Sequence, residues 1–310
     1  MVPIMRRVFR LLSFIGLLAV AATVPISGMM SWRTVSAQSD AITPPEGIET
    51  EGIPKIPSSL AHQLKRYTGA YGLPLAGWHP DKRELWVKGI SSATWVSRIE
   101  SPDAVQKPWL YLSFGGVYDV YFQPQAKYLI YNRDTDGDES FQMYLYNIEN
   151  RSSTRLSEGK SRNTEFVWSN SGENVAYSFS PAKGQGVSLS LINPFDPKSN
   201  RLLAESTGNY LKAYDWSPDD KEVVFCEFIS NTQSKLWLIN VATSEKRLLL
   251  GKIDKESGYF SNPRFSKDGK GIYLITDCDS DVRYLAYLNL ADAKLRNLTA
   301  ETKWDVDEFR

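Results

Sequence analysis

Short apolar runs separated by turn residues recur along most of this chain. In the stretch 216–250, Trp216 opens a predicted short strand that stops at the turn Ser217–Asp220. Proline presets φ for such a turn, and Asp side chains can bond its backbone. Three further strands, rich in β-branched, aromatic and leucine residues, are predicted over 222–228, 236–241 and 246–250, with the polar residues 230–234 as a hairpin loop. Four short antiparallel strands in about 45 residues are typical of one propeller blade.

The same pattern occurs five times in register. Each unit begins with an aromatic residue followed by a turn, and we call these residues the anchors: Trp78, Phe122, Trp168, Trp216 and Phe265. Successive anchors are 44, 46, 48 and 49 residues apart, and an apolar run follows each one. Four units add a second apolar run and then an Arg-Leu or Arg-Asn-Leu strand. The recurrence predicts an all-β propeller of four-stranded blades, with unrelated hairpins of a β-sandwich as the weaker alternative.

The end of the sequence resembles the start of another unit. Phe309 follows Phe265 by 44 residues, within the stretch 304–310. We therefore expect five recognisable blades plus the start of a sixth, and a ring that these residues leave incomplete. An unclosed ring exposes strand edges, so marginal stability is expected for these residues alone.

Residues 1–37 have the pattern of an export signal. Three arginines lie among the first ten residues, an uncharged run extends over 11–32, and 35–37 offers small residues at a cleavage site. The uncharged run could nearly span a bilayer, so an anchor retained at 11–32 is the alternative. Either outcome places the remainder in the periplasm or outside the cell, with membrane contact only through this segment.

The proline-containing stretch 38–59 is predicted to be a linker, and residues 60–310 to form the propeller, with helical spacing over 60–71. The 36 basic and 36 acidic residues balance, so nothing indicates a nucleic-acid partner. Cys226 and Cys278 are the only cysteines. An oxidising compartment permits a disulfide, but buried thiols are the favoured interpretation.

Candidate catalytic chemistry is sparse. The only histidines are His62, in the segment before the first blade, and His79, in the first anchor turn. A Ser-His-Asp site needs a histidine base beside an activated serine, and no G-x-S-x-G nucleophile elbow occurs. Zinc-type Cys/His spacing, a P-loop and a dinucleotide fingerprint are also absent from the sequence. We therefore assign no catalytic residues and no organic cofactor.

Two acidic loops, 134–139 and 277–281, start twelve residues after their anchors and are predicted to be the same hairpin in blades two and five. Asp and Gly are common in hairpin loops, so a solvated turn is the favoured interpretation. A calcium site is the alternative, although an EF-hand would need a glutamate where Leu145 stands. Its ligands would be Asp134, Asp136 and Asp138. A third alternative is contact with a partner domain or a substrate amine through these residues and Glu139.

Several segments, taken in order, resemble the N-terminal propeller of the prolyl oligopeptidase family, particularly its acylaminoacyl-peptidase-like and dipeptidyl-peptidase-like members. The blades also resemble those of TolB-like proteins, which bind partners without catalysis. The resemblance covers about residues 60–310. It rests on the segments GWHP at 77–80, DTDGDESFQMYLY at 134–146, DWSPD at 215–219, TDCDSD at 276–281 and WDVDEF at 304–309.

The peptidase resemblance implies a non-catalytic domain that restricts access of peptides to an α/β-hydrolase domain carrying a Ser-Asp-His triad. None of that domain's catalytic residues has a counterpart in this sequence. Peptide substrate would therefore be cleaved by a hydrolase domain that is missing or separate, and we expect these residues alone to be inactive. The TolB-like resemblance instead implies a stand-alone periplasmic module that binds protein partners.

Overall fold

The computed structural model describes residues 40–68, 74–90, 94–113, 117–135, 137–182, 186–251 and 258–309. The chain divides into two compact units, 1–71 and 72–310, which are considered separately. The predicted signal at 1–37 lies outside the described residues. Within the described ranges, no helix is long and apolar enough to cross a membrane.

The described part of the first unit contains helix α1 (Ser58–Thr68), close to the helical stretch predicted over 60–71. Lys65 and Arg66 lie in its last turn, where positive side chains interact favourably with the helix dipole. The predicted linker is locally paired, since Ala41 and Pro57 form an antiparallel bridge. The backbone N–H of Ile42 donates to the carbonyl of Ile56 at 2.8 Å.

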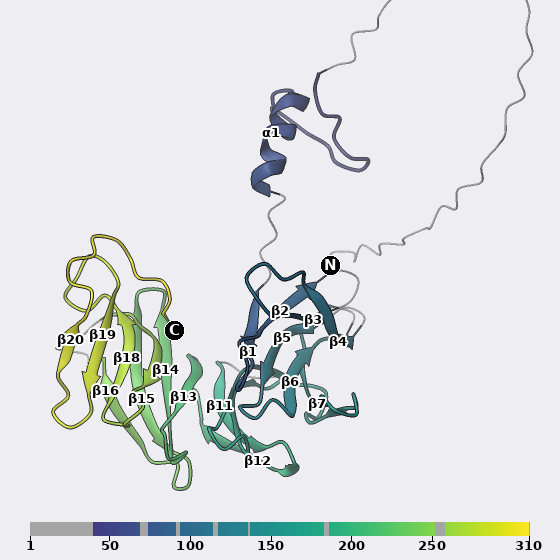
Figure 1. The fold of residues 1–310 in the computed structure, drawn as a ribbon. Coiled ribbons are helices and arrows are strands. Elements are labelled where there is room, and N and C mark those ends of the chain that lie inside the picture. Colours follow the sequence, from purple (N-terminus) through teal and green to yellow (C-terminus); the bar gives the residue numbers. More distant parts are fainter. Residues whose placement is uncertain are drawn as a thin grey trace, which may run out of the picture. The chain divides into compact units, whose positions relative to one another are not determined.

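The second unit consists of five four-stranded antiparallel sheets, each built from four consecutive strands (Figure 1). This confirms the prediction of an all-β propeller architecture with five blades. Blade 1 contains β1 (Leu75–Trp78), β2 (Leu85–Ile90), β3 (Thr94–Ile99) and β4 (Lys107–Ser113); blade 2 contains β5 (Val117–Phe122), β6 (Tyr128–Arg133), β7 (Gln142–Asn147) and β8 (Ser153–Arg155); blade 3 contains β9 (Arg162–Trp168), β10 (Val175–Ser180), β11 (Ser188–Asn193) and β12 (Asp196–Ala204); blade 4 contains β13 (Tyr210–Trp216), β14 (Glu222–Ser230), β15 (Gln233–Asn240) and β16 (Lys246–Leu250); blade 5 contains β17 (Phe260–Phe265), β18 (Gly271–Thr276), β19 (Tyr284–Asn289) and β20 (Leu295–Asn297).

Two local predictions about blade 4 were wrong. Trp216 is the last residue of β13 and not the first residue of a strand. The strand precedes the anchor because the alternating pattern of 210–216 already buries one face, while Ser217 starts the turn. The predicted loop 230–234 is also too long, since Ser230 pairs with Gln233 across a tight turn. The strands extend this far because their backbone pairing continues into the polar residues.

The hydrophobic core lies between neighbouring blades. Four clusters fill the junctions of blades 1–2, 2–3, 3–4 and 4–5. Strand β14 shows why its apolar run is continuous: Val223 and Phe225 belong to the cluster shared with blade 3, whereas Val224 and Cys226 belong to the cluster shared with blade 5. Successive side chains of a strand point to opposite faces, so a blade packed on both sides needs apolar residues at consecutive positions.

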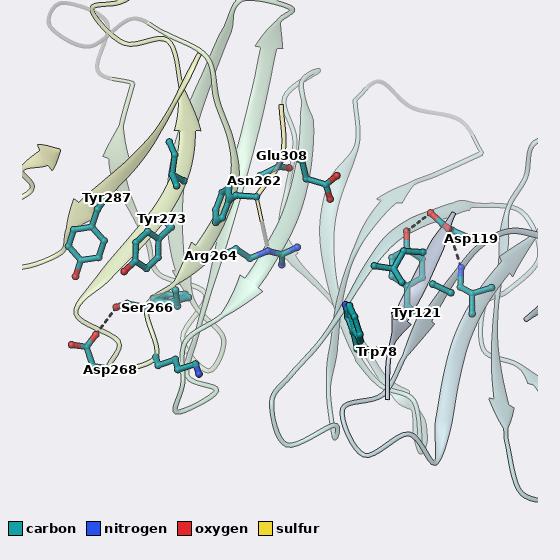
Figure 2. A pocket seen from close by; sticks show the side chains of 18 residues that line it. Trp78, Asp119, Tyr121, Asn262, Arg264, Ser266, Asp268, Tyr273, Tyr287 and Glu308 are labelled. Carbon is teal, nitrogen blue, oxygen red and sulfur yellow. Dashed lines mark hydrogen bonds between the residues drawn. The ribbon is translucent and has the colours of Figure 1, made fainter. Parts of the chain in front are cut away.

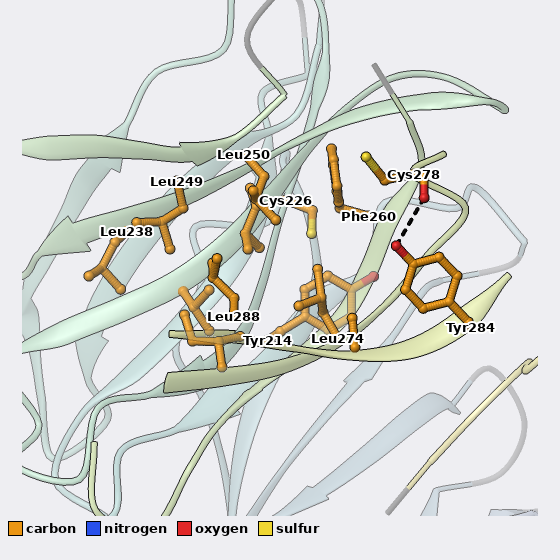
Figure 3. Packing of buried hydrophobic residues seen from close by; sticks show 14 residues of the cluster. Tyr214, Cys226, Leu238, Leu249, Leu250, Phe260, Leu274, Cys278, Tyr284 and Leu288 are labelled. Carbon is orange, nitrogen blue, oxygen red and sulfur yellow. Dashed lines mark hydrogen bonds between the residues drawn. The ribbon is translucent and has the colours of Figure 1, made fainter. Parts of the chain in front are cut away.

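Both cysteines lie in the cluster between blades 4 and 5 (Figure 3). The structure contains them as buried thiols and not as a disulfide, in agreement with the favoured interpretation. Burial raises the pKa of the Cys226 thiol because the thiolate would lose its hydration. Cys226 therefore acts as a small apolar residue of the core.

Residues 304–309 form no strand in the described structure. They run beside blade 5, where the backbone N–H of Val306 donates to the carbonyl of Arg283 at 2.8 Å. The Arg283 guanidinium also bonds the carboxylates of Asp305 and Asp307 at 3.0 and 2.9 Å. Electrostatic contacts thus hold this segment at the edge of blade 5.

Candidate binding channel

The first strand of every blade contains a register irregularity. The pairing shifts at Leu75/Gly77 in β1 and at the corresponding part of β9, β13 and β17, whereas in β5 it shifts earlier in the strand, at Val117/Asp119. Such β-bulges bend a strand and redirect its side chains. Glu165 and Asn262, each three residues before its anchor, have φ angles of 56° and 50° at their bulges. The repeat therefore places redirected side chains on the first strands of all five blades.

Four of these first strands, β5, β9, β13 and β17, carry charged or amide side chains in the positions before their anchors. All five strands contribute to the lining of a cavity of about 530 Å³, which we call the channel. Its walls are partly apolar, through Val120 and Phe166, but a set of polar side chains also lines it. This set includes Tyr121, Glu165, Lys212, Asp215, Asn262 and Arg264.

A larger cavity of about 1190 Å³ lies between blades 1, 2 and 5, and we call it the seam cavity (Figure 2). It shares Trp78, Tyr121 and Arg264 with the lining of the channel. Figure 2 shows Trp78 and Tyr121 on one side and Tyr273 and Tyr287 on the other. The two cavities therefore share part of their lining, and aromatic residues contribute to both.

Asp119 is held by a network at the blade 2 side of the seam cavity. Its carboxylate forms an ion pair with Lys88 at 3.1 Å and accepts a hydrogen bond from the Tyr121 hydroxyl at 3.2 Å. Asn132 is buried and accepts the backbone N–H of Asp119 at 2.9 Å. Burial raises the pKa of Tyr121 well above its usual value, and the nearby Asp119 and Glu165 carboxylates raise it further. Tyr121 is thus a neutral hydrogen-bonding group in the channel wall.

An ion pair joins side chains of blades 3 and 4 in the channel wall. The Glu165 carboxylate and the Lys212 ammonium are 2.8 Å apart, and both side chains are partly exposed. An ion pair of this type contributes little to stability, because both charges keep much of their hydration. The pair is therefore better suited to exchange partners with a ligand than to support the fold.

Blade 5 is tied to blade 4 by a different pair of contacts. The Arg264 guanidinium donates to the carbonyl of Tyr214, and the Asp215 carboxylate accepts the backbone N–H of Phe265 at 2.8 Å. Burial raises the pKa of Asp215, while the Phe265 N–H opposes that shift. These contacts fix the first strand of blade 5 against its neighbour.

His79 has a structural role in the first anchor turn. Its Nδ1 accepts the backbone N–H of Asp81 at 3.0 Å, and its ring packs edge-on against Trp86 at a centroid distance of 5.4 Å. That nitrogen is therefore engaged by the turn backbone and not by a serine hydroxyl. His62 lies on α1, in the other compact unit.

The acidic loops connect the second and third strands of blades 2 and 5, as predicted. Asp138 accepts the backbone N–H groups of Thr135 and Ser140 at 3.3 and 3.0 Å, and Glu139 forms an ion pair with Arg162 of blade 3 at 3.1 Å. Asp136 lies outside the described residues, and among the described ones no cluster of three metal-ligating side chains occurs. The calcium site and the partner contact at Asp134, Asp136, Asp138 and Glu139 remain predictions.

Sequence reasoning missed the channel. A usable signal was present, because charged residues at positions 165, 212, 215 and 264 interrupt strands that should otherwise be apolar on a propeller's packed faces. The bulges that redirect these side chains had no distinct sequence signature. Their positions became visible only through the pairing register.

Comparisons with known proteins identify solved structures that share this fold. No family model and no curated protein matches the sequence. Prolyl oligopeptidase B from Galerina marginata superposes with a TM-score of 0.59 at 14% identity, over 77% of this chain and 38% of that one. TolB from Acinetobacter baumannii superposes with a TM-score of 0.53 at 14% identity, over 79% of this chain and 60% of the TolB chain. A prolyl endopeptidase superposes with a TM-score of 0.55 at 12% identity, over 69% of this chain and 34% of the endopeptidase chain.

The fold defines the class of this chain as a β-propeller of the type found in both the prolyl oligopeptidase and TolB structures. The chain spans less than two thirds of the length of each of those structures. Sequence identities of 12–14% support a shared fold but do not establish a shared activity.

Proposed function

We propose that this chain is an exported, non-catalytic propeller that controls which peptides reach the hydrolase domain of a prolyl oligopeptidase-family serine peptidase. The hydrolase domain would be supplied by polypeptide outside residues 1–310. The observation that carries the proposal is the channel, because all five blades direct hydrogen-bonding or apolar side chains toward one cavity. Export is inferred from the pattern of residues 1–37.

The channel chemistry suits passing peptides better than storing one small ligand. Its side chains include two acids, two bases, an amide and a tyrosine, and some of these groups already pair with each other. A peptide backbone offers both donors and acceptors, so such a mixed surface can bind it without strong preference for one charge. Binding of this kind selects extended chains of small cross-section and excludes folded proteins.

The size of the native polypeptide tests this proposal first. An antibody raised to residues 60–310 is used to probe an extract of the source cells. A band roughly twice the present 35.1 kDa mass supports a peptidase that contains this propeller. A band at or just below that mass, with no neighbouring reading frame for a hydrolase domain, overturns it.

If the longer enzyme exists, its channel can be tested directly. We expect Lys212→Ala, which leaves Glu165 unpaired in the channel wall, to change the relative rates of cleavage of short and long peptides. The rate on a minimal chromogenic dipeptide should stay the same, since that substrate needs no selection. Surface residue Lys294, whose side chain is largely exposed on blade 5, provides the control Lys294→Ala.

A stand-alone TolB-like binding module is the second candidate. It is favoured by the larger share of the TolB structure that this chain spans, 60% against 38% of prolyl oligopeptidase B. Periplasmic cross-linking followed by affinity purification separates the two. A stoichiometric protein partner without peptidase activity supports the binding module, whereas co-purification of a hydrolase domain supports the first proposal.

A further inference from the structure

A third cavity, of about 370 Å³, lies at the end of blade 4 beside the start of blade 5, and we call it the slot. Its walls come from β13, β14, the turn between β14 and β15, and the residue before β17. Blade 4 packs on blade 3 through one apolar cluster and on blade 5 through another, so the slot lies at an internal junction of the chain and not between blades 1 and 5. The lining residues are Tyr210, Phe228, Ile229, Ser230, Asn231 and Tyr259.

Three aromatic rings form one wall of the slot. Tyr210 and Phe228 are directly opposite each other in the β13–β14 pair, with ring centroids 6.2 Å apart. The Phe228 and Tyr259 rings are 5.8 Å apart, and Ile229 beside them is 39% exposed. The volume falls within the range of about 300–1,000 Å³ typical of ligand pockets. A space of this size with aromatic walls suits one large apolar side chain.

The aromatic wall is held in place by contacts with both neighbouring blades. Tyr210 is bridged to Val187 of blade 3, whose backbone forms two hydrogen bonds of 2.8 Å with the residues on either side of Tyr210. The backbone N–H of Tyr259 donates to the Asp277 carboxylate at 2.7 Å. Phe228 packs against the buried cluster between blades 4 and 5. The wall is therefore formed before any ligand arrives, which reduces the entropy that binding would cost.

Strand β13 connects the slot with the channel. Tyr210 of the slot precedes Lys212 of the channel by two residues, or about 7 Å along an extended strand. Burial raises the pKa of Tyr210 and the Glu165 carboxylate raises it further, whereas nearby hydroxyl groups and then Lys212 lower it. The Tyr210 hydroxyl is thus within electrostatic reach of the ion pair in the channel wall. A peptide of a few residues can therefore contact the slot and the channel together.

We propose that the slot is a subsite that binds one large apolar side chain, aromatic or aliphatic, of a peptide whose neighbouring residues lie in the channel. The side chain packs against the rings of Tyr210, Phe228 and Tyr259, and the amide of Asn231 bonds the adjacent peptide backbone. This subsite rests on the proposed peptide-selecting function and adds a sequence preference to it. Peptides with a residue such as phenylalanine or leucine at one position are retained, whereas equivalent peptides with alanine there are not.

Two fluorescein-labelled heptapeptides, AKGFGEA and AKGAGEA, test this preference because they differ in one side chain. Their lysine and glutamate suit the mixed charges of the channel. Each peptide is titrated with the full chain and followed by fluorescence anisotropy. We expect the phenylalanine peptide to bind at least about ten-fold more tightly than the alanine peptide. Tyr259→Ala, which removes one ring of the wall, should weaken binding of the phenylalanine peptide about five-fold or more and leave the alanine peptide unchanged.

A second variant blocks the slot without removing a wall. Asn231→Trp places an extra ring at the exposed hairpin tip, over the slot, and should bring the affinities of the two peptides to within about two-fold of each other. The control is Tyr111→Ala, since Tyr111 lies on β4, is 67% exposed and lines neither the slot nor the channel. It should leave both affinities unchanged. Equal affinities of the two peptides for the wild-type chain would overturn the subsite, as would a full preference retained in both Tyr259→Ala and Asn231→Trp.

Failure of the subsite and failure of the proposed function give different results. If the two peptides bind the wild-type chain equally and Lys212→Ala weakens both, the subsite fails while peptide selection by the channel stands. If neither peptide binds, both proposals fail. A concentration-dependent dimer that Asn231→Trp abolishes would identify a second copy of the chain as the occupant of the slot, and would also overturn the subsite.

Discussion

Trp216 and Trp78 occupy the same position of the repeat, but only Trp216 is buried and hydrogen-bonded across a blade junction. We expect Trp216→Phe to destabilise the fold by about 1 kcal/mol or more, because the Val167 carbonyl loses its donor and the smaller ring leaves a gap. Trp78→Phe should change stability by less than about 0.5 kcal/mol. Urea denaturation of both variants measures the difference. Equal losses would show that the two anchors have equivalent surroundings.

Asp215 predicts a pH dependence at the residue scale. Burial raises its pKa in the folded chain, so the folded state binds the proton more tightly than the unfolded state. Its contribution to stability is therefore largest below the unfolded value of about 3.9 and is lost as the pH rises through the folded pKa. The stability of Asp215→Asn relative to wild type should accordingly increase from acidic toward neutral pH. Denaturant unfolding at a series of pH values measures this trend.

Asp219 provides a control, because its pKa is shifted in the opposite direction to that of Asp215. The hydroxyl of Ser217, and then Lys221, lower the pKa of Asp219 to about 2. Its favourable contribution is present above the unfolded value of about 3.9 and is lost as the pH falls toward 2. The stability of Asp219→Asn relative to wild type should therefore fall as the pH rises through that window. Parallel trends for the two variants would contradict both assignments.

At the scale of elements, the anchor turns connect neighbouring blades as well as consecutive strands. The Asp220 carboxylate accepts the backbone N–H groups of Asn170 and Ser171 in the corresponding turn of blade 3, both at 2.8 Å. Asp220 itself has a φ of 56°, which Asp tolerates better than most residues. The Asn170 side-chain amide also donates to Asp220, at 2.8 Å. We expect Asp220→Ala to cost about 2 kcal/mol, since three charge-assisted bonds are lost at a strained position.

The control for this turn is Asp268→Ala in blade 5. Asp268 accepts the Ser266 hydroxyl and the Lys270 backbone N–H, so it bonds only within its own turn. Its loss should destabilise the fold less than the loss of Asp220 does, because no contact between blades is removed. Thermal and urea denaturation compare the two variants, and a larger effect at Asp268 would refute the role assigned to the inter-blade turn contact.

The acidic hairpin of blade 2 permits a calcium test at the same scale. Asp138 already accepts two backbone N–H groups of its loop, which is the bonding of a self-supported turn. We therefore expect millimolar Ca²⁺ to leave the melting temperature unchanged. A ligand that binds only the folded state must raise that temperature, so a Ca²⁺-dependent rise that Asp138→Asn abolishes would establish the calcium alternative.

For the whole molecule, the packing predicts unequal protection of the blades. Blade 4 shares one apolar cluster with blade 3 and another with blade 5, whereas blade 1 shares a cluster only with blade 2 among the described residues. Backbone amides of β14 should therefore exchange with solvent more slowly than those of β2, because opening them requires separation of two packed junctions. Hydrogen exchange followed by mass spectrometry measures this order. Faster exchange in β14 would indicate that junction packing does not determine local stability.

Much of the architecture was predictable from local pattern. The anchors at 78, 122, 168, 216 and 265 each end the first strand of a blade, and the run 246–250 coincides with β16. The strands of blade 1 after β2 were harder to predict, because Thr94–Ile99 and Lys107–Ser113 mix charged and apolar residues. Turn residues and period-two burial are short-range properties, and a sequence records them directly.

The sequence by itself determined the repeat, the strand-forming segments and the lack of a complete Ser-His-Asp constellation. Tertiary structure decided which charged side chains share a cavity, since Glu165 and Lys212 are 47 positions apart and meet only through blade packing. It also decided that Trp78 faces a cavity while Trp216 is buried, although both begin the same anchor motif. The physical reason is that burial depends on what a neighbouring blade places opposite a residue, and local sequence does not contain that neighbour.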